Sequence, residues 1–126
     1  MTVYQQQRQI SDVAAKANAS GAALFVSIHC NAATNKAARG TETWRYTGCP
    51  HGAKYAAAIQ HHVVEAIGTK DRGVKTTRSL YVLRKTTMPA VLVEVGFISN
   101  AAEEKEIISK TDQIGQAIAA GIIEAK

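Results

Sequence analysis

One charged residue interrupts the most apolar run of the chain. Residues 90–95 read AVLVEV, and Glu94 lies between two valines in a segment that otherwise has the composition of a buried strand. A buried carboxylate costs several kcal/mol unless it is paired, bound to a metal or protonated. Glu94 is therefore either half of a structural ion pair with one of the arginines or a general acid/base. The second role suits a carboxyl group whose pKa is raised by burial.

A second apolar run ends on a histidine. Residues 22–28, AALFVSI, are followed directly by His29, Cys30 and Asn31. His29 is either a hydrogen-bonded residue at the rim of a sheet or a zinc ligand, because imidazole is the commonest metal-binding side chain. Asn31, two residues further on, can project to the same side as His29 and orient a substrate or a ligand residue. A histidine and a glutamate on separate strands together indicate metal-assisted hydrolysis more strongly than either does alone.

Other residues give weaker signals. Glu42 alternates with Trp44 in the segment GTETW, so it can face the same site or pair with a cation. His51 lies close to Cys49 in a loop with glycine and proline, a spacing that is compatible with metal binding but common without it. Cys30 and Cys49 are the two cysteines of the chain, which leaves a single disulfide bridge open as an alternative to two free thiols.

Length and composition indicate one globular domain. The chain has 126 residues, of which 46% are hydrophobic and 20% charged, and no apolar stretch is long enough to span a membrane. Its first residues, MTVYQQQRQI, are polar and do not form a signal peptide. The formal net charge of +5 suits an anionic partner, either nucleic acid or a cell-wall surface. Because net charge is the only feature that favours nucleic acid, no nucleic-acid partner is predicted.

The elements that must position these residues follow from hydrophobic periodicity. Helical spacing predicts helices over residues 5–19 and 53–67, and from residues 101 and 111 onward. Strands are predicted at residues 22–28, 41–46, 80–83 and 90–95, with a basic loop before residue 78. This order predicts an α/β protein with a mostly parallel sheet and helices on both faces. His29 and Glu94 would then lie near the carboxyl ends of two strands, where sites collect in such sheets.

Several segments of the chain are recognisable together: LFVSIHCNA, GTETW, DRGVK, LYVLRKTTMPAVLVEVGF and PAVLVEVGFISNAAEE. They resemble the zinc-dependent N-acetylmuramoyl-L-alanine amidases of the Amidase_3 family, which includes bacterial autolysins and phage endolysins. The resemblance runs over essentially the whole chain. It implies a peptidoglycan hydrolase, acting outside the cell or in the cell wall, that cleaves the amide between N-acetylmuramic acid and the L-alanine of the stem peptide.

The resemblance also implies roles for individual residues. His29 matches the second of two histidines that, with a glutamate, hold one zinc ion in the family, and Glu94 matches the catalytic glutamate. Zinc would polarise the amide and lower the pKa of its bound water, and the carboxylate of Glu94 would carry a proton to the leaving amine. We expect Asn31 to contact the substrate and Glu42 to hold the residues of the site in position without contacting the substrate itself.

The beginning of the chain departs from the family pattern. Family members open with a strand that ends in a motif like DPGHGG, which supplies the first histidine, and then a helix that carries the ligand glutamate. Neither precedes residues 5–19, so we expect a single amidase-like domain, residues 1–126, without its N-terminal strand-helix-strand unit. This leaves three alternatives: a truncated chain that only binds cell wall, missing strands supplied by another chain, or substitute ligands among Glu42, His51 and Cys30. A truncated sheet would also associate through its exposed edges.

Overall fold

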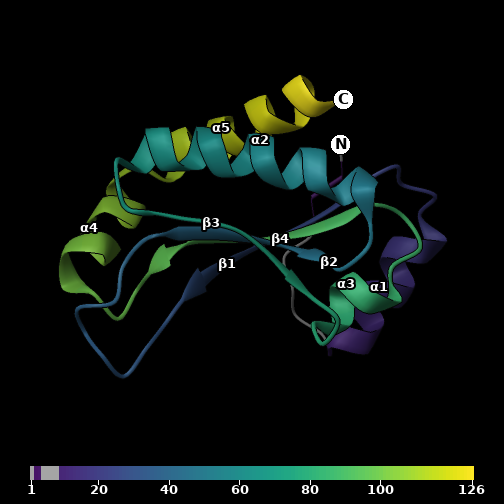
Figure 1. Cartoon of the computed structure of the whole chain (residues 1–126), viewed down its shortest axis with the longest axis horizontal. Coiled ribbons are helices and arrows are strands. Elements are labelled where there is room, and N and C mark those ends of the chain that lie inside the picture. The colour runs from purple at the N-terminus through teal and green to yellow at the C-terminus, as the bar shows by residue number, and fades with distance from the viewer. Residues whose placement is uncertain (1, 4–8) are drawn as a thin grey trace.

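The computed structural model describes residues 2–3 and 9–126, and Figure 1 shows how the helices and strands are arranged. Along the chain these elements are α1 (Ile10–Ala19), β1 (Phe25–Asn31), β2 (Thr41–Tyr46), α2 (Pro50–Ile67), β3 (Asp71–Thr77), α3 (Tyr81–Lys85), β4 (Ala90–Phe97), α4 (Ala101–Ser109) and α5 (Thr111–Ala125). The helix predicted over residues 5–19 is confirmed from Ile10 onward, while residues 4–8 lie outside the described part. The helix predicted from residue 53 begins earlier, at Pro50, because a helix needs no amide hydrogen in its first turn.

Four strands form one sheet in the order β1-β4-β2-β3. β1 pairs with β4 and β2 pairs with β3 in parallel, while β2 and β4 run antiparallel. Two of the three pairings are therefore parallel, which confirms the predicted α/β fold with a mostly parallel sheet. Among the described residues, β1 and β3 form the two edges of this sheet.

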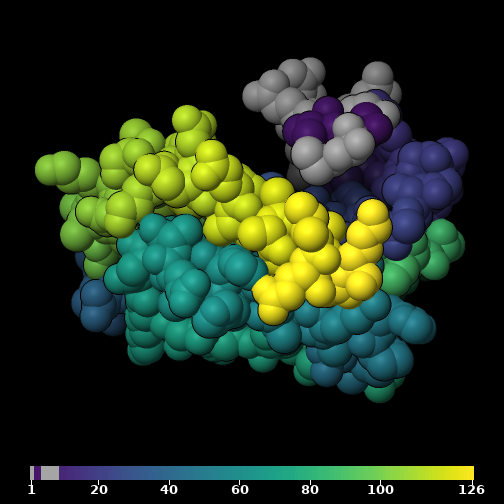
Figure 2. Space-filling view, turned by 90° about the horizontal axis from the view of Figure 1, so that it is seen from above, coloured from purple at the N-terminus to yellow at the C-terminus, as the bar shows by residue number. Residues whose placement is uncertain are grey.

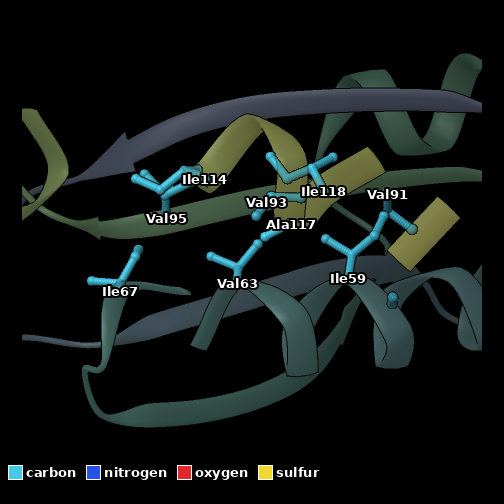
Figure 3. Packing of buried hydrophobic residues seen from close by; sticks show 10 residues of the cluster. Ile59, Val63, Ile67, Val91, Val93, Val95, Ile114, Ala117 and Ile118 are labelled. Atoms are coloured by element: carbon cyan, nitrogen blue, oxygen red, sulfur yellow. The ribbon is translucent and has the colours of Figure 1, made fainter. Parts of the chain in front are cut away.

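One face of the sheet is closed by α2 and α5, which lie side by side over it (Figures 1 and 2). Val91, Val93 and Val95 project from β4 into this layer, and Figure 3 shows them among the aliphatic side chains of the two helices. Gly121 lets α5 approach α2 closely, since a β-carbon at that position would lie 2.7 Å from the Cα atom of Ile59. This layer is the larger of the two hydrophobic cores.

The opposite face of the sheet is covered in part by α1 and α3, so helices lie on both faces as predicted (Figure 1). Leu92 of β4 packs there with Val82 and Leu83 of α3 and with Trp44 of β2. This smaller core ends at Leu92, because the next residue of β4 on the same face is Glu94. One strand, β4, thus supplies both cores through alternate residues.

Two predictions for residues 69–85 are wrong. Residues 80–83, expected as a strand, lie mostly in the helix α3, where the adjacent Val82 and Leu83 are both buried against one core. A strand would have turned these two side chains to opposite faces. The segment expected as a basic loop contains β3, whose charged side chains suit an edge strand that is paired on one side only. A register shift beside Gly73, which has a φ of 83°, hides the strand period in the sequence.

Candidate active site

Three side chains from three strands lie in one row across the sheet. The parallel pairing places His29 of β1 opposite Glu94 of β4, and the antiparallel pairing places Glu42 of β2 opposite the same Glu94. Residues opposite each other in neighbouring strands project to the same face, with β-carbons about 5 Å apart. The row lies on the face of Leu92, just beyond the core that α3 covers. The structure thus brings together the histidine and both glutamates that the sequence singles out.

Glu94 has a carboxyl group without a partner. Its Oε2 atom is buried and makes no hydrogen bond, and no ion pair with Glu94 occurs among the described residues. Burial raises the pKa of Glu94, and the negative charge of Glu42 raises this pKa further. The ion-pair alternative therefore finds no cation in the described part of the chain. The environment of Glu94 fits a general acid/base.

Glu42 attracts the neighbouring cations instead. It is 4% exposed, and the side-chain amide of Asn31 donates a hydrogen bond of 2.7 Å to its Oε1 atom. The Nε atom of Arg72 lies 3.6 Å from Oε1, and the Nζ atom of Lys75 lies 3.7 Å from Oε2. These three groups compensate the charge of Glu42, which lies opposite Glu94 on the neighbouring strand. Asn31 is joined to the row through this contact.

His29 is half-buried, and its Nε2 atom lies 2.6 Å from the hydroxyl oxygen of Ser27. Burial lowers the pKa of His29, which favours the neutral imidazole that metal binding requires. The remaining histidines, His51, His61 and His62, lie on α2 and therefore on the other side of the sheet (Figure 1). His29 is the one histidine that the fold brings to this row.

The described residues do not form a complete metal site. In residues 2–3 and 9–126, no three side chains of His, Cys, Asp or Glu lie close enough together to hold a metal ion. Cys30 and Cys49 are free, so the disulfide alternative is wrong. Burial and the charge of Glu94 raise the pKa of the Cys30 thiol, which disfavours the thiolate that binds metals. The substitute ligands considered from the sequence, Glu42, His51 and Cys30, thus do not complete a site around His29.

A hollow of about 270 Å³ opens beside Glu94. Its lining combines three polar side chains with an apolar wall and two hydroxyl groups, and consists of Asn31, Glu42, Glu94, Trp44, Leu80, Thr77 and Ser79. A concave surface with an apolar wall and a few converging polar groups is the usual form of a small-molecule site. His29 lies next to Glu94 but does not line the hollow itself.

Glu103 is a residue of this region whose role sequence reasoning missed. It is 5% exposed, and its carboxylate accepts hydrogen bonds from the backbone amides of Gly40 and Phe97, at 2.9 and 2.6 Å. The hydroxyl of Thr69 donates a further hydrogen bond over 2.5 Å. Gly40 immediately precedes β2 and Phe97 ends β4, so Glu103 fastens together the two strands that carry the glutamates of the row.

The signal for Glu103 was present in the sequence as a helix-capping pattern. Asn100 and Glu103 have the spacing of a capping box, and the side chain of Asn100 accepts a hydrogen bond from the backbone amide of Glu103. In that pattern the glutamate usually turns back to the capping residue, whereas here it turns to the sheet. A β-carbon at Gly96 would lie 2.7 Å from the Glu103 carboxylate, so only glycine leaves room for this contact.

Comparisons with known proteins identify a family for the chain. The profile of the family described as N-acetylmuramoyl-L-alanine amidase matches residues 1–124. The chain is 37% identical over 127 residues to the N-acetylmuramoyl-L-alanine amidase LytC of Bacillus subtilis, covering 97% of this chain and 24% of the relative. It is 38% identical over 122 residues to the endolysin of Bacillus phage SPP1, covering 92% of this chain and 43% of the endolysin.

Solved structures share the fold. The N-acetylmuramoyl-L-alanine amidase from Clostridium difficile 630 superposes with a TM-score of 0.86 at 36% identity, over 93% of this chain and 64% of that one. The catalytic domain of the amidase CwlV from Bacillus (Paenibacillus) polymyxa var. colistinus gives 0.85 at 35% identity, over 93% and 65%. The chain therefore spans less than half of the two curated relatives and about two thirds of these two solved chains. By its family profile and by its fold, the chain belongs to the N-acetylmuramoyl-L-alanine amidase family.

Proposed function

We propose that this chain hydrolyses the amide between N-acetylmuramic acid and the L-alanine of the peptidoglycan stem peptide, with Glu94 as the group that moves the proton. The observation that carries the proposal is the buried, unpartnered carboxyl oxygen of Glu94 beside an open hollow, in a chain of the amidase family. The names of its relatives, a cell wall amidase and an endolysin among them, support peptidoglycan as the substrate and the cell wall as the place of action. No helix in the described part of the chain is long and apolar enough to cross a membrane.

The chemistry of amide hydrolysis matches what Glu94 offers. A water molecule adds to the carbonyl carbon, the carbon–nitrogen bond breaks, and a proton passes from the water to the departing amine. As a carboxylate Glu94 can take the proton from the water, and as a carboxylic acid it can give that proton to the amine nitrogen. A raised pKa brings both forms closer to neutral pH, where such a group works best. Asn31, which also lines the hollow, would orient the substrate.

Zinc stays a prediction from the family resemblance. His29 offers one nitrogen ligand, but a catalytic zinc site needs three protein ligands, and the described residues do not supply such a set. We propose that a zinc ion at His29 takes its other ligands from another copy of the chain, because residues 1 and 4–8, which lie outside the described part, contain no His, Cys, Asp or Glu. Elemental analysis of the purified chain after dialysis against trace zinc tests this. One zinc ion per chain, lost in the variant His29→Ala, supports the proposal, while no bound zinc contradicts it for the 126-residue chain.

The bond that is cleaved can be identified from the products. Incubation of the chain with purified sacculi is expected to release stem peptides with free L-alanine amino termini, without new reducing sugar ends. Labelling of amino termini followed by mass spectrometry measures both. New reducing ends, or new amino termini on residues other than L-alanine, would show a glycosidase or an endopeptidase and contradict the proposal.

A second candidate function is binding to the cell wall without turnover. It is favoured by one observation, the absence of a three-ligand metal set from the described residues. Sedimentation with sacculi separates the two functions. Binding that persists in a chelator, together with no release of L-alanine termini after zinc is added, supports the binding function and excludes the amidase.

β1 is the edge strand best suited to the predicted association through a sheet edge. The amide of Phe25 donates to the carbonyl of Pro89, and the carbonyl of Asn31 accepts from Ile98, so these residues turn their backbone groups toward β4 and its continuation. The alternate residues of β1 turn theirs to the free side. β1 carries no charged residue, and its Ile28 is 57% exposed. Natural edges are usually protected by charges, and this one lacks that protection.

We propose that β1 pairs with another β-strand in solution, either in a second copy or in an N-terminal segment of the same fold. Sedimentation velocity of the 126-residue chain is expected to show concentration-dependent association that Ile28→Lys removes. Val74→Lys on β3, the other edge, is the matched control and should leave association unchanged. A chain that stays monomeric at every concentration, or equal effects of the two variants, would contradict association through β1.

A further inference from the structure

The residues that line the hollow beside Glu94 form two groups of different chemistry. One group is Asn31, Glu42 and Glu94; the other, called the wall here, combines the indole of Trp44 and the side chain of Leu80 with the hydroxyl groups of Thr77 and Ser79. Trp44 is the single tryptophan of the chain and is half-buried, so one part of its ring system packs in the core and another part remains accessible. The proton-transfer role proposed for Glu94 leaves this wall without a function.

The wall lies at a defined distance from the reacting group. Trp44 follows Glu42 by two residues on β2, and its register partner Leu92 precedes Glu94 by two residues on β4. Two residues of an extended strand cover about 7 Å. This is roughly the space that one pyranose ring or one amino acid occupies next to a bond held at Glu94. The wall therefore lies where it can contact the sugar ring or the amino acid nearest to the scissile amide.

The charges of the lining favour an uncharged group. The lining contains the carboxyl groups of Glu42 and Glu94 and no lysine or arginine, because Arg72 and Lys75 lie against Glu42 without lining the hollow. The two cations are engaged with Glu42, so an acidic group in the hollow would meet the uncompensated carboxyl group of Glu94 and no cation in the lining. A sugar ring within a glycan strand is neutral, and it presents an apolar face of C–H groups as well as hydroxyl and acetamido groups.

The hydroxyl groups of the wall suit such a ring. The hydroxyl oxygens of Thr77 and Ser79 lie 2.9 Å apart and share one hydrogen bond, in which either can be the donor. The hydroxyl that accepts this bond keeps its own hydrogen free for a ligand in the hollow. The accessible part of the indole beside them offers a flat apolar surface for the C–H groups of a pyranose.

We propose that Trp44, Thr77 and Ser79 form a subsite for the N-acetylated sugar ring of the substrate, on the Trp44 side of Glu94, with the stem peptide on the Asn31 side. This inference rests on the proposed function, because it assumes that the scissile amide lies at Glu94. Beyond that function, it places the sugar at Trp44 and the stem peptide at Asn31, and it names the residues that recognise the sugar.

Fluorescence of the single tryptophan tests the assignment in the wild-type 126-residue chain. Three probes are titrated: the neutral sugar tri-N-acetylchitotriose, the dipeptide L-alanyl-D-isoglutamine, and N-acetylmuramoyl-L-alanyl-D-isoglutamine, which contains both parts. The sugar and the complete compound are expected to change the Trp44 emission in a saturable manner, and the dipeptide is expected to leave it unchanged. A saturable change with the dipeptide alone would assign the wall to the peptide. No change with any probe would remove the subsite altogether.

Two threonines provide a matched pair of variants. Thr77→Val removes the hydroxyl at the hollow and keeps the side-chain shape, and is expected to weaken sugar binding about three- to tenfold, the effect of one lost hydrogen bond. Thr76→Val changes the exposed neighbour on the other face of β3 and is expected to have no effect. Titration calorimetry of Trp44→Phe and Trp44→Ala adds a test of the ring, because phenylalanine should retain more of the sugar binding than alanine. Equal affinities of the two threonine variants would overturn the proposal.

These results separate the subsite from the proposed function. Sugar binding at Trp44 without cleavage of sacculi would leave the subsite standing and reject the amidase function of this chain. Cleavage of sacculi with an unresponsive Trp44 would leave the amidase function standing and reject the subsite.

Discussion

The two faces of the sheet differ in how far their helices extend. On one face, α2 and α5 cover the valines of β4 as far as Val95. Val91, Val93 and Val95 all lie in the larger core. On the other face, the core under α3 ends at Leu92, and the next position of β4 holds Glu94. Both sets of residues belong to the same strand, so the difference comes from the side chains that β4 carries on each face together with the helices that cover them.

This contrast explains how an uncompensated carboxyl group is tolerated. The closed face supplies the apolar packing that stabilises the sheet, and the open face then carries Glu94 at a cost that the fold can bear. Glu103 holds the backbone of Gly40 and Phe97 in place, and Arg72 and Lys75 pair with Glu42, but none of these groups neutralises Glu94. The larger hydrophobic core thus lies on one face and the candidate chemistry on the other.

The largest effect on stability is expected from Glu103, which serves both faces by joining β2 to β4. Glu103→Ala leaves the buried amides of Gly40 and Phe97 without an acceptor and should lower the free energy of unfolding by about 3 to 5 kcal/mol. Urea unfolding measures this change. Glu104→Ala, at the exposed neighbouring position, is the matched control and should change it by less than about 0.5 kcal/mol. Similar losses in both variants would show that Glu103 does not hold the two strands.

A smaller effect is expected from the closed face. Val93 is fully buried between β4 and the two helices, so Val93→Ala should lower the free energy of unfolding by about 2 kcal/mol through lost contacts and the cavity left behind. Val74→Ala on the edge strand β3 provides the comparison, because Val74 is 38% exposed. Equal losses of unfolding free energy in Val74→Ala and Val93→Ala would contradict this comparison of the two faces.

The smallest change in stability, and one of opposite sign, is expected at Glu94. Its pKa is raised above the usual value near 4.5, so the folded state binds the proton more tightly than the unfolded state does. Wild-type stability should therefore fall as the pH rises from that value through the raised pKa. Glu94→Gln removes this dependence and should be more stable than the wild type at neutral pH, but not at pH 4. Urea unfolding at several pH values checks this, and parallel curves for the two proteins would contradict a raised pKa.

Much of the fold was predictable from the sequence because burial leaves a local pattern. The apolar runs before His29 and around Glu94 predicted β1 and β4, and helical spacing predicted the helices that cover the sheet. Of these two strands β4 is central and buried, while β1 lies at an edge of the sheet. The strand β3 and the helix α3 escaped this reasoning for physical reasons. An edge strand with a register shift keeps charged side chains in solvent, and a five-residue helix is too short to show a helical period.

The sequence allowed the residues of the candidate site to be predicted, but not the contacts between them. The positions of His29, Asn31, Glu42 and Glu94 could be named from residue types in unusual places and from the family resemblance. Their arrangement depends on β4 inserting between β1 and β2, which is a long-range pairing that no local pattern encodes. Arg72 is the clearest case, since its contact with Glu42 depends on a strand that resembled a loop in the sequence.

The most direct test of the central claim is the rate at which L-alanine amino termini appear in purified sacculi, measured for the wild-type chain, Glu94→Gln and the surface control Glu104→Gln in the presence of zinc. The wild type and Glu104→Gln are expected to release these termini at equal rates, while Glu94→Gln is expected to be slower by about a hundredfold or more because it lacks a general acid/base. Equal rates in all three proteins would show that Glu94 does not move the proton, and would contradict the assignment of this open face as the active site.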